Sequence, residues 1–181
     1  KDKLNKSAEN EFLNIALETL DLYEKVVDYE RELISKAVKN AGEERLKELL
    51  LIDESLSAIR NSKPKTFHQA LQMFWLYALL AGCINYGRLD EYLGPYLKHD
   101  LETGLITEED AYRYLKSLWT LIENRRTTVN GRIITGGYGR KNIEAADIFT
   151  RIALRVTKDC KYVEPQFTLR ITKETPQDIM D

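Results

Sequence analysis

The chain of 181 residues has only two cysteines and two histidines. Cys83 and Cys160 provide neither a disulfide framework nor a paired-cysteine metal motif. Two histidines also argue against a histidine-rich metal site, and no metal ligand is predicted. Scarce cysteine is typical of a reducing cytoplasm, which is the expected location.

Long apolar runs and an excess of one charge are also missing. The longest apolar run, Met73–Ile84, is interrupted by Tyr77 and Gly82 and is too short to span a bilayer. The first residues, KDKLNKSAENEF, lack the apolar centre of a signal peptide. A net charge of −2 provides no basic surface for nucleic acid. With 43% hydrophobic and 31% charged residues, the sequence predicts a soluble globular protein that binds neither membrane nor nucleic acid.

Helical periodicity dominates residues 1–126, which are predicted to form a mainly helical region. Apolar residues recur at helical spacing over 8–41, about 43–60, about 67–81 and from 108 onward. The residues predicted to cap helices are Ser7, Thr66 and Thr107. Thr107 precedes three acidic residues, which favour the positive end of a helix.

The pattern changes after Arg126. The stretch TTVNGRIITGGYGRKN is β-branched and then Gly-rich, which predicts a strand over 131–135 and a tight loop. A helix is expected over 143–156, and EPQFTLRIT then alternates like a half-exposed strand. Residues 127–181 are therefore predicted to be a strand–helix–strand region, which makes the fold class α-rich α/β with parallel strands.

Two short motifs suggest chemistry and also have simpler explanations. Gly136, Gly137 and Gly139 lie between a strand and a helix, where N–H groups could hold an anion. The complete phosphate-binding motifs are absent, however, and a tight turn with positive φ explains the glycines more simply. Tyr112 and Lys116 have the Y-x-x-x-K spacing of short-chain dehydrogenases, but here the Gly-rich loop follows the pair instead of preceding it.

Isolated cysteines and histidines give little more. Cys83 lies in a Gly-flanked break at the end of an apolar helix, where it could line a pocket. Lone cysteines are more often small buried apolar residues, and Cys160 lacks even this context. His68 and His99 are expected to cap or pack. Composition and spacing alone therefore predict an α-rich domain with a βαβ element, and no reaction.

A longer segment resembles a known family. RLDEYLGPYLKHDLETGLITEEDAYRYL, which follows Gly87, is similar to part of the glycyl radical enzymes, the superfamily of pyruvate formate-lyase and the glycerol and diol dehydratases. RNSKPKTFHQALQMFW upstream, and TGG and EPQFTLRITKETP downstream, resemble further blocks of that family in the same order. The matching positions of the first segment are Gly87, Arg88, Asp90, Tyr92, Pro95, Tyr96, Asp100, Gly104, Thr107, Glu109 and Ala111.

The resemblance implies outer helices and a few parallel strands of a glycyl-radical-enzyme-type barrel. GRLDEYLGPY is closer to the dehydratase, decarboxylase and C–X lyase branches than to the formate-lyase branch. The implied activity is hydrogen abstraction from a small organic substrate by a cysteine thiyl radical in an anaerobic, cytoplasmic enzyme. An iron–sulfur, S-adenosylmethionine-dependent activase would install the glycyl radical elsewhere in the parent protein. The implied partners are that polypeptide, the activase and the small-molecule substrate, with a homodimer left open.

The chain also departs from the family pattern. The segment LLAGCINYGR is shorter than its counterpart, and neither the thiyl-cysteine loop nor the glycyl loop is recognised. Cys83 and Cys160 stand in the wrong blocks to replace that cysteine, so no catalytic residue is predicted and the chain alone is not expected to be active. It is expected to be a piece of a longer polypeptide. The alternative is a non-catalytic helical interaction domain, or a degenerate one, derived from the same scaffold.

Site residues follow from the resemblance. Residues just before Gly87 are expected near the substrate, which makes Cys83 and Asn85 substrate-binding candidates. Asn130, shortly before the Gly pair, is the third candidate, and the alternative for both asparagines is a turn cap. Arg88 is expected to pair with a carboxylate or with strand-end carbonyls. The residues assigned to structure are Arg88, Asp90, Gly136 and Gly137.

Overall fold

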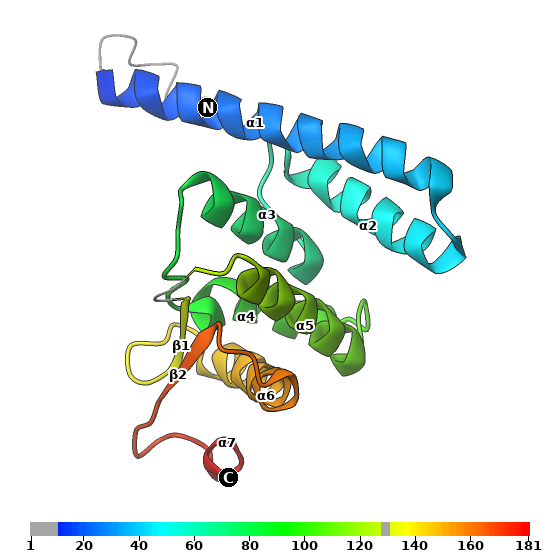
Figure 1. Ribbon diagram of the computed structural model, residues 1–181. Coiled ribbons are helices and arrows are strands. Elements are labelled where there is room, and N and C mark those ends of the chain that lie inside the picture. The colour runs from blue at the N-terminus through cyan, green and yellow to red at the C-terminus, as the bar shows by residue number, and fades with distance from the viewer. Residues whose placement is uncertain (1–10, 128–130) are drawn as a thin grey trace. The chain divides into compact units, whose positions relative to one another are not determined.

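The computed structural model describes residues 11–127 and 131–181 (Figure 1). Ser7, a predicted N-cap, and Asn130, a predicted substrate contact, lie outside the described residues. The contacts divide the chain into two compact units, Lys1–Pro64 and Lys65–Asp181. This boundary coincides with the NSKPKTF break between two helices.

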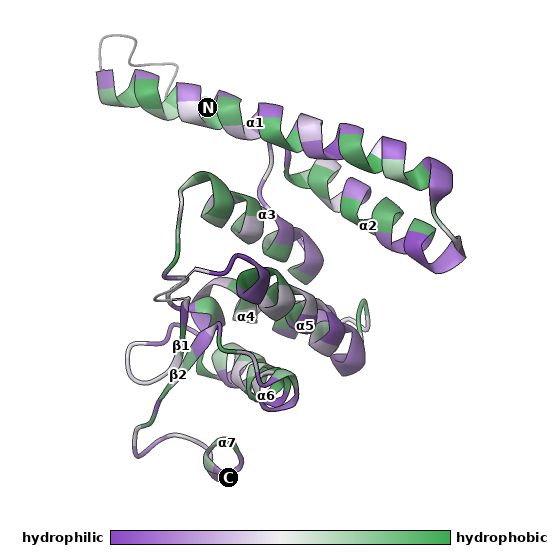
Figure 2. Cartoon of the chain, in the orientation of Figure 1, coloured by the Kyte–Doolittle hydropathy of each residue, from purple (hydrophilic) through white to green (hydrophobic). Residues whose placement is uncertain are grey.

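The first unit is a pair of helices joined by a short turn. Hydrophilic and hydrophobic residues alternate along both helices in Figure 2, as expected of amphipathic helices. Arg60 donates to both carboxylate oxygens of Asp28 at 2.7 and 2.8 Å, and Arg31 donates to Asp53 at 2.8 and 3.2 Å. Such exposed pairs fix register more than they add stability, since each contributes about 0–1 kcal/mol. The elements are α1 (Glu11–Ala37), the 3-10 turn η1 (Val38–Asn40) and α2 (Glu43–Ile59).

The second unit combines helices with a small parallel sheet. β1 pairs in parallel with β2, with Ile133 opposite Phe167 and Gly136 opposite Arg170. The predicted α-rich α/β class and the strand–helix–strand order are thereby confirmed. Its elements are α3 (Phe67–Leu80), α4 (Leu89–Glu102), α5 (Glu108–Asn124), β1 (Arg132–Gly136), α6 (Ile143–Cys160), β2 (Gln166–Arg170) and α7 (Gln177–Met180).

Side-chain caps set where the helices of this unit begin. Thr66 accepts a hydrogen bond from the Gln69 N–H at 3.3 Å, and Asn142 accepts one from the Ala145 N–H at 3.0 Å. Thr107 forms a complete capping box with Asp110. Each cap satisfies an N–H group that the first helical turn leaves unpaired, which contributes about 1 kcal/mol.

The core of the second unit lies where α4, α5 and α6 meet the sheet. A Cβ built on Gly94 of α4 would come within 2.8 Å of the Ala145 carbonyl oxygen, so only glycine permits this close crossing with α6. Each fully buried Leu, Ile or Phe contributes about 1.5–3 kcal/mol. The largest fully buried side chains here include Phe67, Leu89, Leu93, Leu97, Leu115, Trp119, Ile122, Ile133 and Phe149.

A buried carboxylate connects two of these helices. Asp100, near the end of α4, is fully buried and accepts a hydrogen bond from the Phe67 N–H at 2.6 Å. Phe67 is the first residue of α3, so the negative charge lies at the positive end of that helix. The carbonyl of Asp100 also accepts from the N–H groups of Leu105 and Ile106. One residue therefore joins the α4–α5 turn to α3.

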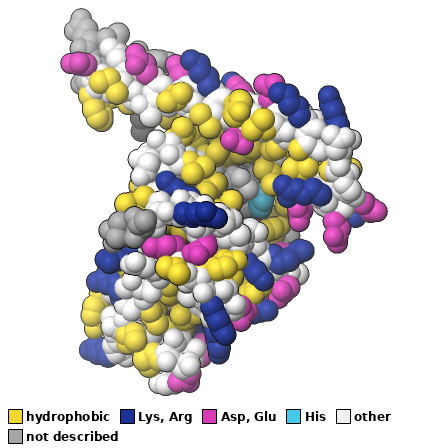
Figure 3. Space-filling model, in the orientation of Figure 1, with side chains coloured by type: hydrophobic (Ala, Val, Ile, Leu, Met, Phe, Trp, Pro, Cys, Tyr) yellow, Lys and Arg dark blue, Asp and Glu magenta, His cyan; other side chains and the backbone are white. Residues whose placement is uncertain are grey.

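The exposed surface mixes charge with apolar side chains. Figure 3 shows Lys and Arg interspersed with Asp and Glu on the face in view. No helix in the described parts of the chain is long and apolar enough to cross a membrane.

The first prediction concerns His68, on α3, whose ring centroid lies 4.9 Å from that of Tyr114. Burial lowers the pKa of His68 from 6.5 to about 4. As pH falls from 6.5 toward 4, the His68 imidazole takes up a proton in the unfolded chain but stays neutral in the folded protein. The free energy of unfolding should therefore fall by up to about 3 kcal/mol across this window, and the contribution of neutral His68 is complete above it.

Urea unfolding at a series of pH values measures this dependence. His68→Gln should flatten the curve below pH 6.5 relative to the natural protein. Ser117→Ala, at an exposed position of α5 that does not titrate, is the control and should retain the slope. Equal slopes in the natural protein and His68→Gln would contradict the assignment.

Candidate functional site

A third parallel segment extends the sheet beyond β1. The Tyr86 N–H donates to the Arg132 carbonyl at 2.9 Å, and the Ile134 N–H donates to the Gly87 carbonyl at 2.8 Å. Gly87 bridges Ile133 in parallel. The Gly-Arg pair therefore stands at the carboxyl end of a strand-like segment, immediately before α4, on the side of β1 opposite β2.

Asp90 is the centre of this edge. It is 1% exposed, and its carboxylate accepts from Arg88 Nε and Nη2, each at 3.0 Å. The same carboxylate accepts from the N–H of Gly136 at 2.9 Å, which ties the start of α4 to the end of β1. The hydrogen bond to Asp90 is also the main cause that raises the pKa of Arg88.

The carboxylate oxygens of Asp90 are fully used by hydrogen bonds within the protein. Its two oxygens receive four donors, from Arg88 Nε and Nη2 and from the N–H groups of Glu91 and Gly136. A carboxylate offers about four lone-pair positions, so this one has none left for a substrate proton. Arg88 thus pairs with a carboxylate, one of the two partners anticipated for it.

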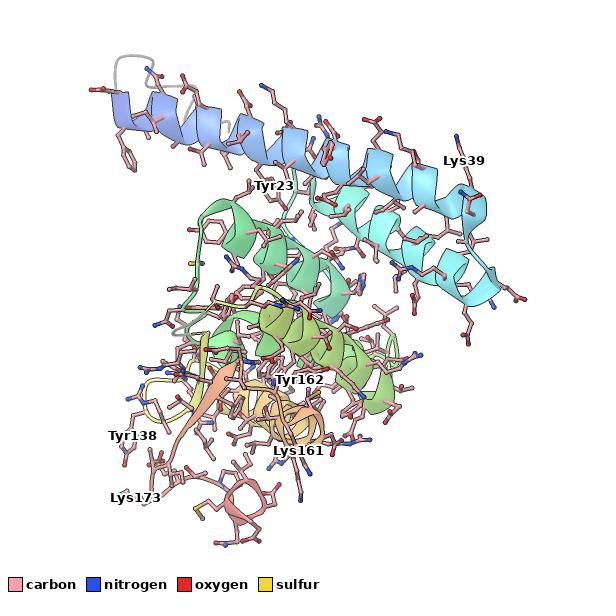
Figure 4. The ribbon with its side chains drawn as sticks, viewed as in Figure 1. Tyr23, Lys39, Tyr138, Lys161, Tyr162 and Lys173 are labelled. Carbon is pink, nitrogen blue, oxygen red and sulfur yellow. The ribbon has the colours of Figure 1, made fainter. Side chains whose placement is uncertain are left out.

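The loop after β1 is held at several points. Arg140 Nε donates to the Gly137 carbonyl at 2.9 Å, and its Nη1 pairs with Asp147 of α6. The Lys141 N–H donates to Glu91 at 3.1 Å. Tyr138 points outward from this loop in Figure 4 and is 59% exposed. The Gly-rich turn is therefore fixed by protein contacts, and its Gly136 N–H is already used by Asp90.

The sheet has two different faces. Ile133 and Thr135 of β1 are buried, Phe167 packs against the core cluster, and α4 and α6 contact β1. The alternate residues form the opposite face, which we call the open face. The exposure pattern of both strands places on the open face Arg132, Ile134, Gln166, Thr168 and Arg170, of which only Ile134 is partly buried and the rest are exposed.

Two of the predicted substrate contacts precede Gly87, away from the Asp90 edge. Asn85 is exposed, and its Oδ1 accepts from the Gly87 N–H at 3.2 Å. Cys83 is partly exposed, and its carbonyl accepts from Arg125 Nη1 at 2.5 Å. Arg125 also donates to the Tyr86 hydroxyl at 3.1 Å. The described residues thus bring Arg88, Asp90 and the Gly pair together, while Cys83 and Asn85 stand at the other end of the Tyr86–Arg88 segment.

Other residues with chemical potential have structural partners. The Tyr112 hydroxyl donates to Asp159 at 2.9 Å, and the Arg155 guanidinium lies 4.3 Å from the Tyr112 ring centroid. Burial raises the pKa of Cys160, which disfavours a reactive thiolate. Within residues 11–127 and 131–181, no group of three or more His, Cys, Asp or Glu side chains could hold a metal ion.

The sequence analysis missed two features of the site. Arg125 holds the segment before Gly87 through hydrogen bonds to the Cys83 carbonyl and the Tyr86 hydroxyl, and no local sequence pattern predicts these contacts. Arg170 lies on the open face opposite Gly136. Its signal was present, because the alternation in EPQFTLRIT already set Thr168 and Arg170 on the exposed side.

Comparison with known proteins agrees with this architecture. The family model "Pyruvate formate lyase-like" matches residues 1–181. The chain is 28% identical to trans-4-hydroxy-L-proline dehydratase from Clostridioides difficile, over 99% of this chain and 25% of that protein. It is 25% identical to a glycyl radical enzyme of known structure from Archaeoglobus fulgidus, with a TM-score of 0.73 over 88% of this chain and 23% of the other. A structure concerning 1,2-propanediol dehydration in Roseburia inulinivorans shares the fold, at 17% identity with a TM-score of 0.81 over 99% of this chain and 26% of the other.

The chain belongs to the pyruvate formate lyase-like family, as its resemblance implied. The relatives found are glycyl radical dehydratases, decarboxylases and lyases. They include a (2S)-3-sulfopropanediol dehydratase, isethionate sulfite-lyases and the glycyl radical subunit of a 4-hydroxyphenylacetate decarboxylase. The chain spans about a quarter of the length of the curated relatives that it matches over most of its residues.

The second prediction tests the Asp90 edge. Arg88→Ala should lower the free energy of unfolding of the full-length protein by about 3–5 kcal/mol, because it leaves a buried carboxylate without its counter-charge. Arg113→Ala is the matched control, since Arg113 pairs with Asp110 along an exposed helix and should cost about 0–1 kcal/mol. Both are measured by thermal and urea unfolding. Similar losses for the two variants would refute the role given to Asp90.

Proposed function

We propose that the chain forms part of the wall of the substrate cavity in a glycyl radical enzyme of the dehydratase, decarboxylase or C–X lyase type. The observation that carries the proposal is the two-faced sheet. One face packs on α4 and α6, and the open face carries polar side chains. All-parallel sheets normally have both faces covered by apolar layers, so a polar face suits a barrel wall around a polar ligand.

The radical chemistry belongs to other parts of the parent polypeptide in this proposal. A glycyl radical, installed by an iron–sulfur, S-adenosylmethionine-dependent activase, would supply the hydrogen-abstracting cysteine thiyl radical. Cys83 and Cys160 do not take that role. This chain contributes rigidity through the Asp90 edge and polar contacts through the sheet and the residues before Gly87.

The third prediction concerns the reaction. The activated full-length protein should eliminate a small group, such as water, from a hydroxylated, aminated or aromatic molecule, and should not cleave pyruvate with coenzyme A. The expectation rests on GRLDEYLGPY and on relatives named as dehydratases. The measurement combines electron paramagnetic resonance for the glycyl radical with product analysis by mass spectrometry. Efficient turnover of pyruvate and coenzyme A would overturn the proposal.

A second candidate function is a non-catalytic domain on the same scaffold, which the shortened LLAGCINYGR segment favours. The reading frame downstream of this chain discriminates between the two. A cysteine-containing loop followed by an R-V-x-G glycyl loop supports the enzyme. A complete natural polypeptide of about the 21.0 kDa of this chain would support the non-catalytic domain.

The fourth prediction tests Asn85 and Asn130 as substrate contacts. In the activated full-length enzyme, Asn85→Ala and Asn130→Ala should each raise KM or lower kcat. Asn85→Ala also loses the hydrogen bond from the Gly87 N–H, which costs about 0.5–1.5 kcal/mol of stability.

Asn85→Asp separates the two effects at position 85. It keeps the oxygen that accepts from the Gly87 N–H but removes the amide N–H donors. Reduced kinetics with an unchanged melting temperature in Asn85→Asp would support substrate contact. Natural kinetics in Asn85→Asp and Asn130→Ala would leave both residues as turn caps.

A further inference from the structure

Among the described residues, the carboxyl edge of the sheet carries an arginine that no carboxylate pairs with. Arg88 is matched by Asp90, and Arg140 is matched by Asp147. The side chain of Arg170, the last residue of β2, takes part in none of the ion pairs or hydrogen bonds among the described residues. It is exposed on the open face rather than against the helices.

The Gly pair makes room for this arginine. A Cβ built on Gly137 would come within 3.0 Å of Arg170 Nε and 3.2 Å of its Cζ, so the guanidinium lies against the bare backbone of Gly137. A Cβ on Gly136 would come within 2.5 Å of the Arg170 carbonyl oxygen. Both glycines also have positive φ, at +73° and +81°. Side chains at either position would displace Arg170 or the backbone that carries it.

The neighbours of Arg170 on the open face are one polar residue, one apolar residue and one glycine. Thr168 precedes it by two residues on the same face, and Ile134 lies opposite Thr168 on β1. Gly136, directly opposite Arg170, presents no side chain. Ligands of parallel sheets bind outside the carboxyl ends of the strands, and Arg170 stands at that end. Arg132 is on the same face at the amino end of β1, four residues before Gly136.

We propose that Arg170 binds the anionic group, a carboxylate or a sulfonate, of the small substrate of the parent enzyme. The planar guanidinium can donate two parallel hydrogen bonds to two oxygens of such a group. One side of the guanidinium lies against the Gly137 backbone. This inference rests on the proposed function and narrows its substrate class to anions. Four kinds of relative are named for molecules that carry a carboxylate or a sulfonate, namely trans-4-hydroxy-L-proline, (2S)-3-sulfopropanediol, isethionate and 4-hydroxyphenylacetate.

Binding to the full-length protein without activation tests the inference separately from catalysis. Isothermal titration calorimetry would use trans-4-hydroxy-L-proline, isethionate and (2S)-3-sulfopropanediol as anionic probes, and 1,2-propanediol as the uncharged probe. The variants are Arg170→Gln and Arg170→Lys. Arg113→Gln is the matched control, because it removes an exposed arginine of α5 that lies outside the sheet and pairs with Asp110.

We expect at least one anionic probe to bind the natural protein. Arg170→Gln should raise its Kd roughly ten- to hundredfold, since a charge-assisted bidentate contact is lost. The Kd of Arg170→Lys should lie between those of the natural protein and Arg170→Gln, because lysine keeps the charge but cannot form the bidentate contact. Arg113→Gln should change the Kd less than about threefold, because its charge is exposed and screened by solvent. Melting temperatures measured alongside show that each variant is folded.

Several results would overturn the inference. They are an unchanged Kd in Arg170→Gln, an equal loss in Arg113→Gln, or no binding of any anionic probe to the natural protein. A lower melting temperature in Arg170→Gln with unchanged Kd would mean that Arg170 pairs with a carboxylate of the parent polypeptide. An Arg170-dependent Kd in a protein that shows no turnover after activation would instead refute the proposed reaction and leave the anion site standing.

Discussion

The second unit depends on one buried carboxylate. Asp90 joins Arg88, the first turn of α4 and the end of β1 through four hydrogen bonds. Burying a charge costs several kcal/mol unless the charge is paired and fully hydrogen-bonded, so these partners cannot be changed one at a time. One carboxylate therefore holds together the Gly-Arg pair, the start of α4 and the Gly pair, although Asp90 and Gly136 are 46 residues apart in sequence.

The close crossing of α4 and α6 is the second constraint, and it determines which face of the sheet is left open. Gly94 lets α4 approach the Ala145 backbone, and small residues at 145 and 146 complete the contact. Both helices can then cover the same face of β1. The other face keeps Arg132, Gln166, Thr168 and Arg170. Because both helices pack on one face of the sheet, the other face is left to carry polar side chains that could contact a substrate.

Local signals in the sequence predicted most helices and both strands, but helical periodicity did not predict α4, and the contacts between elements were predicted poorly. Thr66 and Thr107 were identifiable as caps because a cap acts within one helical turn. The strand ends followed from alternation and from glycines that need positive φ. The compact unit that ends at Pro64 depends on which helices contact one another, which periodicity does not encode. The same holds for Arg125 on the Cys83 carbonyl, because that partner is a backbone atom with no signature of its own.

Asn85 and Arg170 show why residue type alone does not determine what a side chain contacts. Asn85 was singled out as a polar residue next to a recognised motif, yet its Oδ1 is occupied by the Gly87 N–H, and only its amide donors remain for a ligand. Arg170 lies in a strand that looked merely half-exposed, yet parallel pairing sets it opposite Gly136 and against Gly137. The parallel register explains this placement, because it sets Arg170 opposite Gly136, which has no side chain. On the polar face of this sheet, the guanidinium of Arg170 has two glycines beside it. Larger side chains at those two positions would take up the space in which an anion could approach the guanidinium.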